Sequence, residues 1–191
     1  MCPRIRISPG FCLLTGWFTA VNGWKLLAAV LGATVLHELG HWAALRLTGA
    51  EIRGLRIGVL GAVLETDSAG LSYGQELAVL LAGPGANLLG ALVLAGLGAE
   101  TAAGAQLVLG GFNLLPVRPL DGGRALYLAA AWLLGPAAGD RAARWAGCSA
   151  ALGLAIFLGE VMRCTGGSLW LLPALAGLLL AAAREAFVGA E

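Results

Sequence analysis

The chain has 191 residues, of which 59% are hydrophobic and 12% are charged, and its mean hydropathy is +0.83. A soluble domain carries about twice that share of charged residues. The formal net charge of +1 provides no basic field, which argues against a nucleic-acid partner. The composition therefore predicts an all-α integral membrane protein, built as a single transmembrane domain over residues 1–191, in a lipid bilayer.

Apolar runs along the chain predict about six transmembrane helices. Arg4 and Arg6 ahead of the first run also fit a signal peptide, but the later runs and the lack of a soluble domain favour an uncleaved first helix. The expected spans are residues 7–24, 25–48, 77–99, a broken span over 101–134, 145–160 and 164–183.

The longest polar stretch, residues 51–74, lies between the second and third spans. Residues 55–60 and 62–64 are rich in β-prone side chains and are separated by a glycine, which predicts a short β-hairpin-like loop. Two interpretations stay open. The segment is either a plain cytoplasmic loop or a sheet edge that could pair with an extended substrate strand.

Basic residues are distributed unevenly between the two sides of the predicted bundle. With six spans both termini lie on the same side, and by the positive-inside rule the side richer in basic residues is cytoplasmic. That side carries Arg4, Arg6, Arg46, Arg53, Arg56, Arg141, Arg144 and Arg184, whereas the other side carries Lys25 and Arg163.

The only two histidines of the chain are His37 and His41, and they flank the sequence Glu-Leu-Gly within an apolar run. On a helix this spacing places both imidazoles on one face, with Glu38 beside them. Two such imidazoles and a third ligand can hold Zn²⁺, and the carboxylate can activate water for peptide hydrolysis. The alternative is an ordinary helix whose histidines bond to neighbouring groups.

A zinc site then needs a third ligand, which must be a carboxylate or a thiol. The four cysteines show no ligand spacing, and the three aspartates are Asp67, Asp121 and Asp140. Asp121 follows a run with Pro116 and Pro119 and precedes Gly122 and Gly123. We expect the helix to unwind there, because prolines remove backbone donors and the glycine pair permits unusual dihedrals. Irregular backbone at membrane depth lines a wet cavity or is buried in protein. Asp121 is therefore well placed to complete the site, although it could instead cap the next helix.

Asn87 and Asn113 are amide side chains within apolar helices. One interpretation is interhelical hydrogen bonding, which is common for amides in membranes. The other is that they hold the substrate backbone or stabilise the oxyanion of the reaction. Both interpretations stay open from the sequence.

Three segments together resemble the site-2 protease family of intramembrane zinc metalloproteases: HELGH at 37–41, AGPGAN at 82–87 and NLLPVRPLDGG at 113–123. Their order is most similar to the sporulation-type branch, whose members cleave a membrane-associated precursor of a transcription factor. The likeness covers residues 7–185. It implies that His37, His41 and Asp121 bind zinc and that Glu38 is the catalytic base. Pro116, Pro119 and Gly122 then support the helix break.

The resemblance also implies a membrane-associated protein or peptide substrate, regulated intramembrane proteolysis and a place in a bacterial cytoplasmic membrane. A regulatory membrane protein or a second copy of the chain stays open as a partner. We expect two departures from the family, namely that no PDZ-like insert fits between the spans and that the nucleotide-sensing C-terminal domain of many sporulation-type members is absent. The competing hypotheses are a membrane metal transporter, which would be expected to show internal repeats, and a non-catalytic scaffold.

Overall fold

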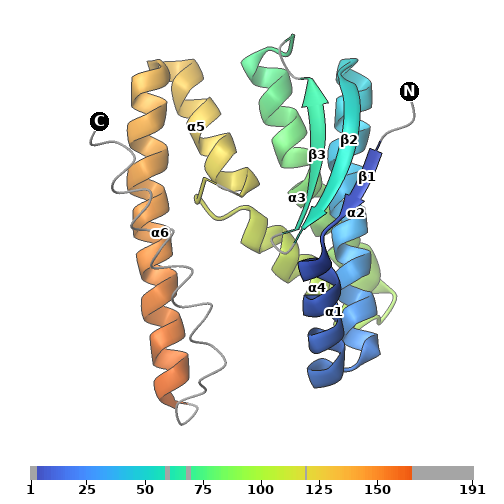
Figure 1. Cartoon of the computed structure of the whole chain (residues 1–191). Coiled ribbons are helices and arrows are strands. Elements are labelled where there is room, and N and C mark those ends of the chain that lie inside the picture. The colour runs from blue at the N-terminus through green and yellow to red at the C-terminus, as the bar shows by residue number, and fades with distance from the viewer. Residues whose placement is uncertain (1–3, 59–60, 68–69, 119, 165–191) are drawn as a thin grey trace. The chain divides into compact units, whose positions relative to one another are not determined.

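The computed structural model describes residues 4–58, 61–67, 70–118 and 120–164 (Figure 1). Its elements divide between two compact units, one ending at Asn113 and one beginning at Leu114, which are described separately below. Pro119 and the predicted span 164–183, apart from its first residue, lie outside the described residues. The elements in chain order are β1 Arg4–Ile7, α1 Pro9–Asn22, α2 Trp24–Thr48, β2 Glu51–Gly58, β3 Gly61–Asp67, α3 Tyr73–Gly96, α4 Glu100–Asn113, α5 Asp121–Leu134 and α6 Pro136–Cys164.

The first unit is built around α2, which packs against α3 and α4, while α1 packs against α2. Local sequence sets the ends of these helices. Gly49 follows α2 with a left-handed φ of 78°, which glycine adopts at little cost. Ser72 begins α3 with a capping box that it shares with Gln75, so two backbone donors of the first turn are satisfied. The end of the motif helix α2 and the start of α3 are thereby well defined.

Strands β2 and β3 form an antiparallel hairpin in which Leu55 pairs with Leu64. This confirms the hairpin that was predicted for the polar stretch. The sheet has one strand more than predicted, because β1 pairs with β2 in parallel. The three strands lie in the order β1-β2-β3 (Figure 1). A strand of four residues with a distant parallel partner leaves little local pattern, so the sequence reading missed β1.

The second unit consists of the turn after Asn113, α5 and α6, and α5 packs against α6. Gly139 makes this contact close, since a Cβ there would lie 2.8 Å from the carbonyl oxygen of Tyr127. The predicted helix break is confirmed, because α4 ends at Asn113 and α5 begins at Asp121. The last described helix begins earlier than expected, at Pro136 rather than at 145. Proline suits the first helical turn, and Gly135 before it has a φ of 91°.

Three of the described helices, α2, α3 and α6, are long and apolar enough to cross a membrane. The helices α1, α4 and α5 have 14 residues each. Such a helix rises about 21 Å, which is less than the ~30 Å hydrocarbon core. Large apolar side chains such as Leu47, Leu92 and Leu133 are exposed, as expected where lipid takes the place of water. The chain is a multi-pass membrane protein.

Candidate metal centre

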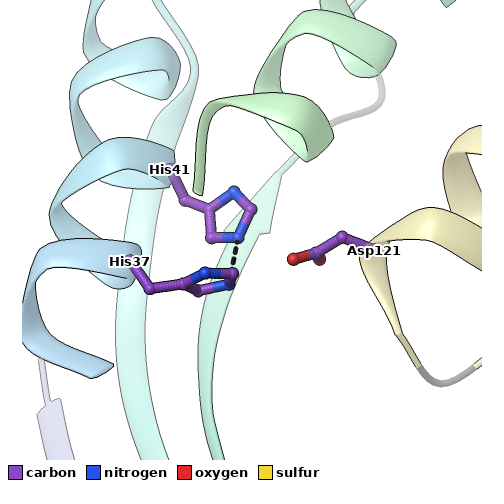
Figure 2. Close-up of side chains that lie close together, drawn as sticks. All are labelled: His37, His41 and Asp121. Carbon is purple, nitrogen blue, oxygen red and sulfur yellow. Dashed lines mark hydrogen bonds between the residues drawn. The ribbon is translucent and has the colours of Figure 1, made fainter. Parts of the chain in front are cut away.

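His37 and His41 project from one face of α2 and are both buried, with 6% and 9% of their surface exposed. Their Nε2 atoms lie 3.0 Å apart, and the ring planes are nearly perpendicular, at 82°. Figure 2 shows the two rings and the contact between them. The i, i+4 spacing produces this arrangement, since residues four apart stack on the same side of a helix. Both histidines therefore present the same ring nitrogen to one point.

The outer nitrogens of the two rings are hydrogen-bonded to α3. His41 Nδ1 lies 2.8 Å from the carbonyl oxygen of Val79, and His37 Nδ1 lies 2.6 Å from Oδ1 of Asn87. A carbonyl oxygen can only accept, so His41 Nδ1 carries the proton. The amide of Asn87 donates through Nδ2 to the carbonyl of Ala33, so its Oδ1 accepts from His37. In the neutral form of each ring, Nε2 is then the lone-pair nitrogen.

This proton arrangement provides a test of whether zinc fits the site. Two lone pairs 3.0 Å apart repel each other unless a cation lies between them. Zinc binds imidazole nitrogen at about 2.0–2.1 Å, and two such bonds at a tetrahedral angle separate the nitrogens by about 3.3 Å. The observed separation is within a few tenths of an ångström of that value, and Nδ1–H bonded to a carbonyl is the usual support for a zinc-bound histidine. The pair fits zinc.

Glycines bring α2 and α3 close enough for these contacts. A Cβ on Gly83 would lie within contact distance of three atoms of the His41 ring, and a Cβ on Gly40 would meet the carbonyl of Ala82. Pro84 follows inside α3 and is fully buried. Proline has no N–H and disturbs the helical bonding of its turn. The AGPGAN segment is thus the surface of α3 against which the His41 ring packs.

Asp121 is the first residue of α5, directly after the break. The helix N-cap is Leu120, which forms no side-chain cap bond, so Asp121 does not occupy the capping position. The expectation that the following glycines adopt unusual dihedrals is wrong, because both lie within α5 and neither has a positive φ. Close approach explains them instead. A Cβ on Gly122 would collide with the backbone of Leu114, and one on Gly123 with the backbone of Val117.

His37, His41 and Asp121 form the group of potential metal ligands found among the described residues (Figure 2). Two nitrogens and a carboxylate are donors that zinc accepts. Asp140 has a different environment, since it is exposed and lies 2.6 Å from Arg118 Nη2 in an ion pair. Glu38 is half-buried and follows His37 on α2. The assignment of His37, His41 and Asp121 as zinc ligands stays a prediction that this group of donors is chemically suited to fulfil.

The predicted amides differ in their surroundings. Asn87 is fully buried between helices, whereas Asn113 is half-buried and donates from Nδ2 to the Leu109 carbonyl of its own helix at 3.1 Å. Sequence reasoning missed two supporting groups, the carbonyl of Val79 and the side chain of Gln106. A backbone carbonyl leaves no signal in the sequence. Gln106 does leave one, because an amide in an apolar helix is costly unless it is bonded.

Comparison with known proteins supports this picture. Residues 25–103 match the family model named Peptidase family M50, and this region contains both histidines and Glu38. These residues are therefore similar in sequence to M50 peptidases. Asp121 lies beyond the matched region, so its assignment depends on the ligand group described above. This similarity indicates no particular branch of that family.

Individual relatives match parts of the chain. Rip3 of Mycobacterium tuberculosis, which bears the name of a zinc metalloprotease, is 31% identical over 130 residues, covering 60% of this chain and 32% of Rip3. Zinc metalloprotease MJ0392 of Methanocaldococcus jannaschii is 32% identical over 116 residues, covering 54% of this chain and 34% of that protein. The chain thus spans about a third of the length of these curated relatives.

The fold has a solved counterpart, the site-2 protease from Methanocaldococcus jannaschii. The TM-score is 0.66, with 24% identity, and the match covers 95% of this chain and 89% of that one. At this identity the likeness concerns the fold alone.

Proposed function

We propose that the protein is an intramembrane zinc endopeptidase that hydrolyses a peptide bond in or near a membrane segment of a membrane-associated protein. The observation that carries the proposal is the pair of imidazole nitrogens 3.0 Å apart, with their protons fixed on the outer side of each ring. Glu38 follows the first of these histidines within the M50-matching region. The metalloprotease names of the relatives support the same activity.

Each site residue has a chemical task in this proposal. His37, His41 and Asp121 hold the ion, and zinc held there supplies Lewis acidity that activates water and polarises the scissile carbonyl. Glu38 accepts the proton of the attacking water and passes it to the leaving amine. Asn113 has an amide donor near the helix break, and we assign it to the substrate backbone or the oxyanion.

The helix break has a structural task in the same scheme. We assign the break between α4 and α5 to Pro116, Pro119 and Gly122. The break allows Asp121 to lie at the start of a helix. We propose that these two short helices form the halves of one crossing in a six-crossing bundle. Both termini then face the cytoplasm of a bacterial cell, in accordance with the distribution of basic residues.

The substrate must be extended at the cut, because a helix shields its carbonyls within its own hydrogen bonds. His37 and His41 lie 11 and 7 residues before Thr48, the last residue of α2, which is about 10–16 Å at 1.5 Å per residue. We therefore place cleavage in the cytoplasmic part of the substrate's membrane segment, with the β2–β3 hairpin as a candidate edge for holding the unwound strand. Release of a membrane-held regulator, as in the sporulation-type branch, is the role that we propose on motif order.

The experiment uses purified protein in proteoliposomes with two model substrates. One substrate carries a Gly-Pro pair in the cytoplasmic part of its membrane segment, and the other has a poly-Leu segment. We expect the wild type to cut the first and not the second. Glu38→Gln should retain zinc and lose activity by about a thousand-fold or more, since base catalysis and water positioning are both removed. Glu160→Gln, on an exposed carboxylate paired with Arg163, should behave like the wild type.

Two outcomes would contradict the proposal. Cleavage by the zinc-loaded Glu38→Gln variant at the wild-type rate would exclude Glu38 as the base. Zinc transport across the vesicle membrane without any cleavage would favour the transporter hypothesis instead. A wild type that holds zinc but neither cleaves nor transports would favour the scaffold.

A further inference from the structure

A buried chain of amide side chains leads from α4 to the metal centre. Gln106 on α4 is 5% exposed, and Asn87 on α3 is 0% exposed. Asn87 Nδ2 donates to Oε1 of Gln106 at 2.5 Å, and Asn87 Oδ1 accepts from Nδ1 of His37 at 2.6 Å. Three helices of the first unit are thus linked through polar groups that end on one proposed zinc ligand.

The side-chain amide of Asn87 already uses both of its N–H groups and its oxygen in hydrogen bonds within the protein. Its two N–H groups point to the carbonyl oxygen of Ala33, at 2.9 Å, and to Gln106. A side-chain amide has two donor hydrogens, so neither is left to bind a substrate carbonyl or an oxyanion. The role that remains for Asn87 is to orient His37.

We propose that Gln106 is a positioning residue that, through Asn87, holds the His37 ring with its Nε2 lone pair toward the metal. The side-chain amide of Asn87 can take two orientations, with either Oδ1 or Nδ2 toward His37. Only the orientation with Oδ1 toward His37 leaves the Nε2 lone pair of that ring available to zinc. If the amide were flipped, its NH₂ group would face His37 Nδ1, and the proton of the ring would move to Nε2. Oδ1 would then face two acceptors, the carbonyl of Ala33 and Oε1 of Gln106. Gln106 therefore adds to the cost of the wrong orientation.

Glycines lie next to the side chains of Asn87 and Gln106. A Cβ on Gly110 would lie 2.9 Å from Cβ of Asn87, and one on Gly90 would lie 2.6 Å from Cδ2 of Leu36 and 3.3 Å from Cδ of Gln106. A larger residue at position 110 would press on Asn87, and one at position 90 would press first on Leu36 and then on Gln106. Gly110 thus leaves room for Asn87, and Gly90 leaves room for both Leu36 and Gln106.

The proposal rests on the zinc site of the proposed function, and its test measures the metal directly. Gln106→Met replaces the amide with an apolar side chain of similar length, which removes the acceptor while filling the space. Gln106→Glu restores an acceptor oxygen at the same place. Leu128→Ala, at a buried apolar position on α5, is the control for general loss of stability. The readouts are zinc affinity, by competition with a chromogenic chelator, and the absorption spectrum of the Co²⁺-substituted protein.

We expect Gln106→Met to weaken zinc binding about tenfold, at the low end for outer groups that support a metal ligand, and to shift the Co²⁺ bands. Gln106→Glu should recover most of the affinity, and Leu128→Ala should lower thermal stability without changing either readout. Wild-type affinity and an unshifted spectrum in Gln106→Met would overturn the proposal, and so would an equal loss in Gln106→Glu. If Gln106→Met does not fold, Gln106→Ala serves in its place. A wild type without zinc would be a failure of the proposed function itself, which this comparison separates from a failure of the amide chain.

Discussion

The two parts of the proposed metal site are held by different physical means. On α2, His37 and His41 are fixed by side-chain and carbonyl hydrogen bonds to α3 and by glycines that let the rings pack closely. In the second unit, the turn after Asn113 folds against the first turn of α5 at Gly122, and this close backbone contact fixes where the helix that carries Asp121 begins. Hydrogen bonds to α3 orient the histidine rings, whereas a close backbone contact sets the start of the helix that carries the aspartate.

This difference follows from what each ligand has to offer the metal. A histidine must present one particular nitrogen, so its proton and ring plane both have to be fixed, which requires directional bonds. A carboxylate has two equivalent oxygens and no proton to place. It needs only a position, and the start of a helix favours its negative charge. Glycine-to-alanine substitutions can therefore test separately how the histidine rings are oriented and how Asp121 is positioned.

The largest effect is expected from Gly83→Ala. The new Cβ would occupy space now filled by the His41 ring, and that ring cannot move while it keeps its bond to Val79. We expect zinc affinity to fall by about a hundredfold, the upper range for disturbing the support of a ligand.

Gly85→Ala is the matched control for Gly83→Ala. It lies on the same helix, and a Cβ there meets nothing within 4 Å, so affinity should not change. Equal zinc affinities in the two variants, measured by chelator competition, would show that the position of the His41 ring does not matter.

A smaller effect is expected from Gly122→Ala, which pushes the turn at Leu114 away from α5. Because Asp121 contributes one ligand of three and its carboxylate can reorient, we expect zinc affinity to fall about tenfold. Gly104→Ala on α4, where a Cβ meets nothing within 4 Å, is the control and should keep wild-type affinity. A Gly122→Ala variant with wild-type affinity would mean that the backbone contact does not position Asp121.

The same difference decides how far the sequence predicts the site. The spacing of His37 and His41 predicts their shared face, because helix periodicity is local. The prolines predict the break before Asp121 because the loss of a backbone N–H is also a local effect. The pairing of Asn87 with Gln106 links residues of different helices, and no local pattern encodes which amide meets which.

The sheet shows the same limit. The hairpin of β2 and β3 is visible in the sequence because its strands adjoin, whereas β1 pairs with a strand some fifty residues away, with Arg4 beside Gly54. The reason for the glycine pair after Asp121 was also misjudged. Glycine serves both unusual dihedrals and close approach, and sequence alone does not distinguish the two.

The most direct test is the zinc content of purified protein, measured by elemental analysis in the wild type and in three aspartate variants. The account predicts one zinc per chain in the wild type, a sharp loss in Asp121→Ala, and full content in Asp67→Ala and Asp140→Ala. The last variant removes only an exposed ion pair with Arg118. Full zinc content in Asp121→Ala, or loss in either of the other two, would contradict a site made by His37, His41 and Asp121.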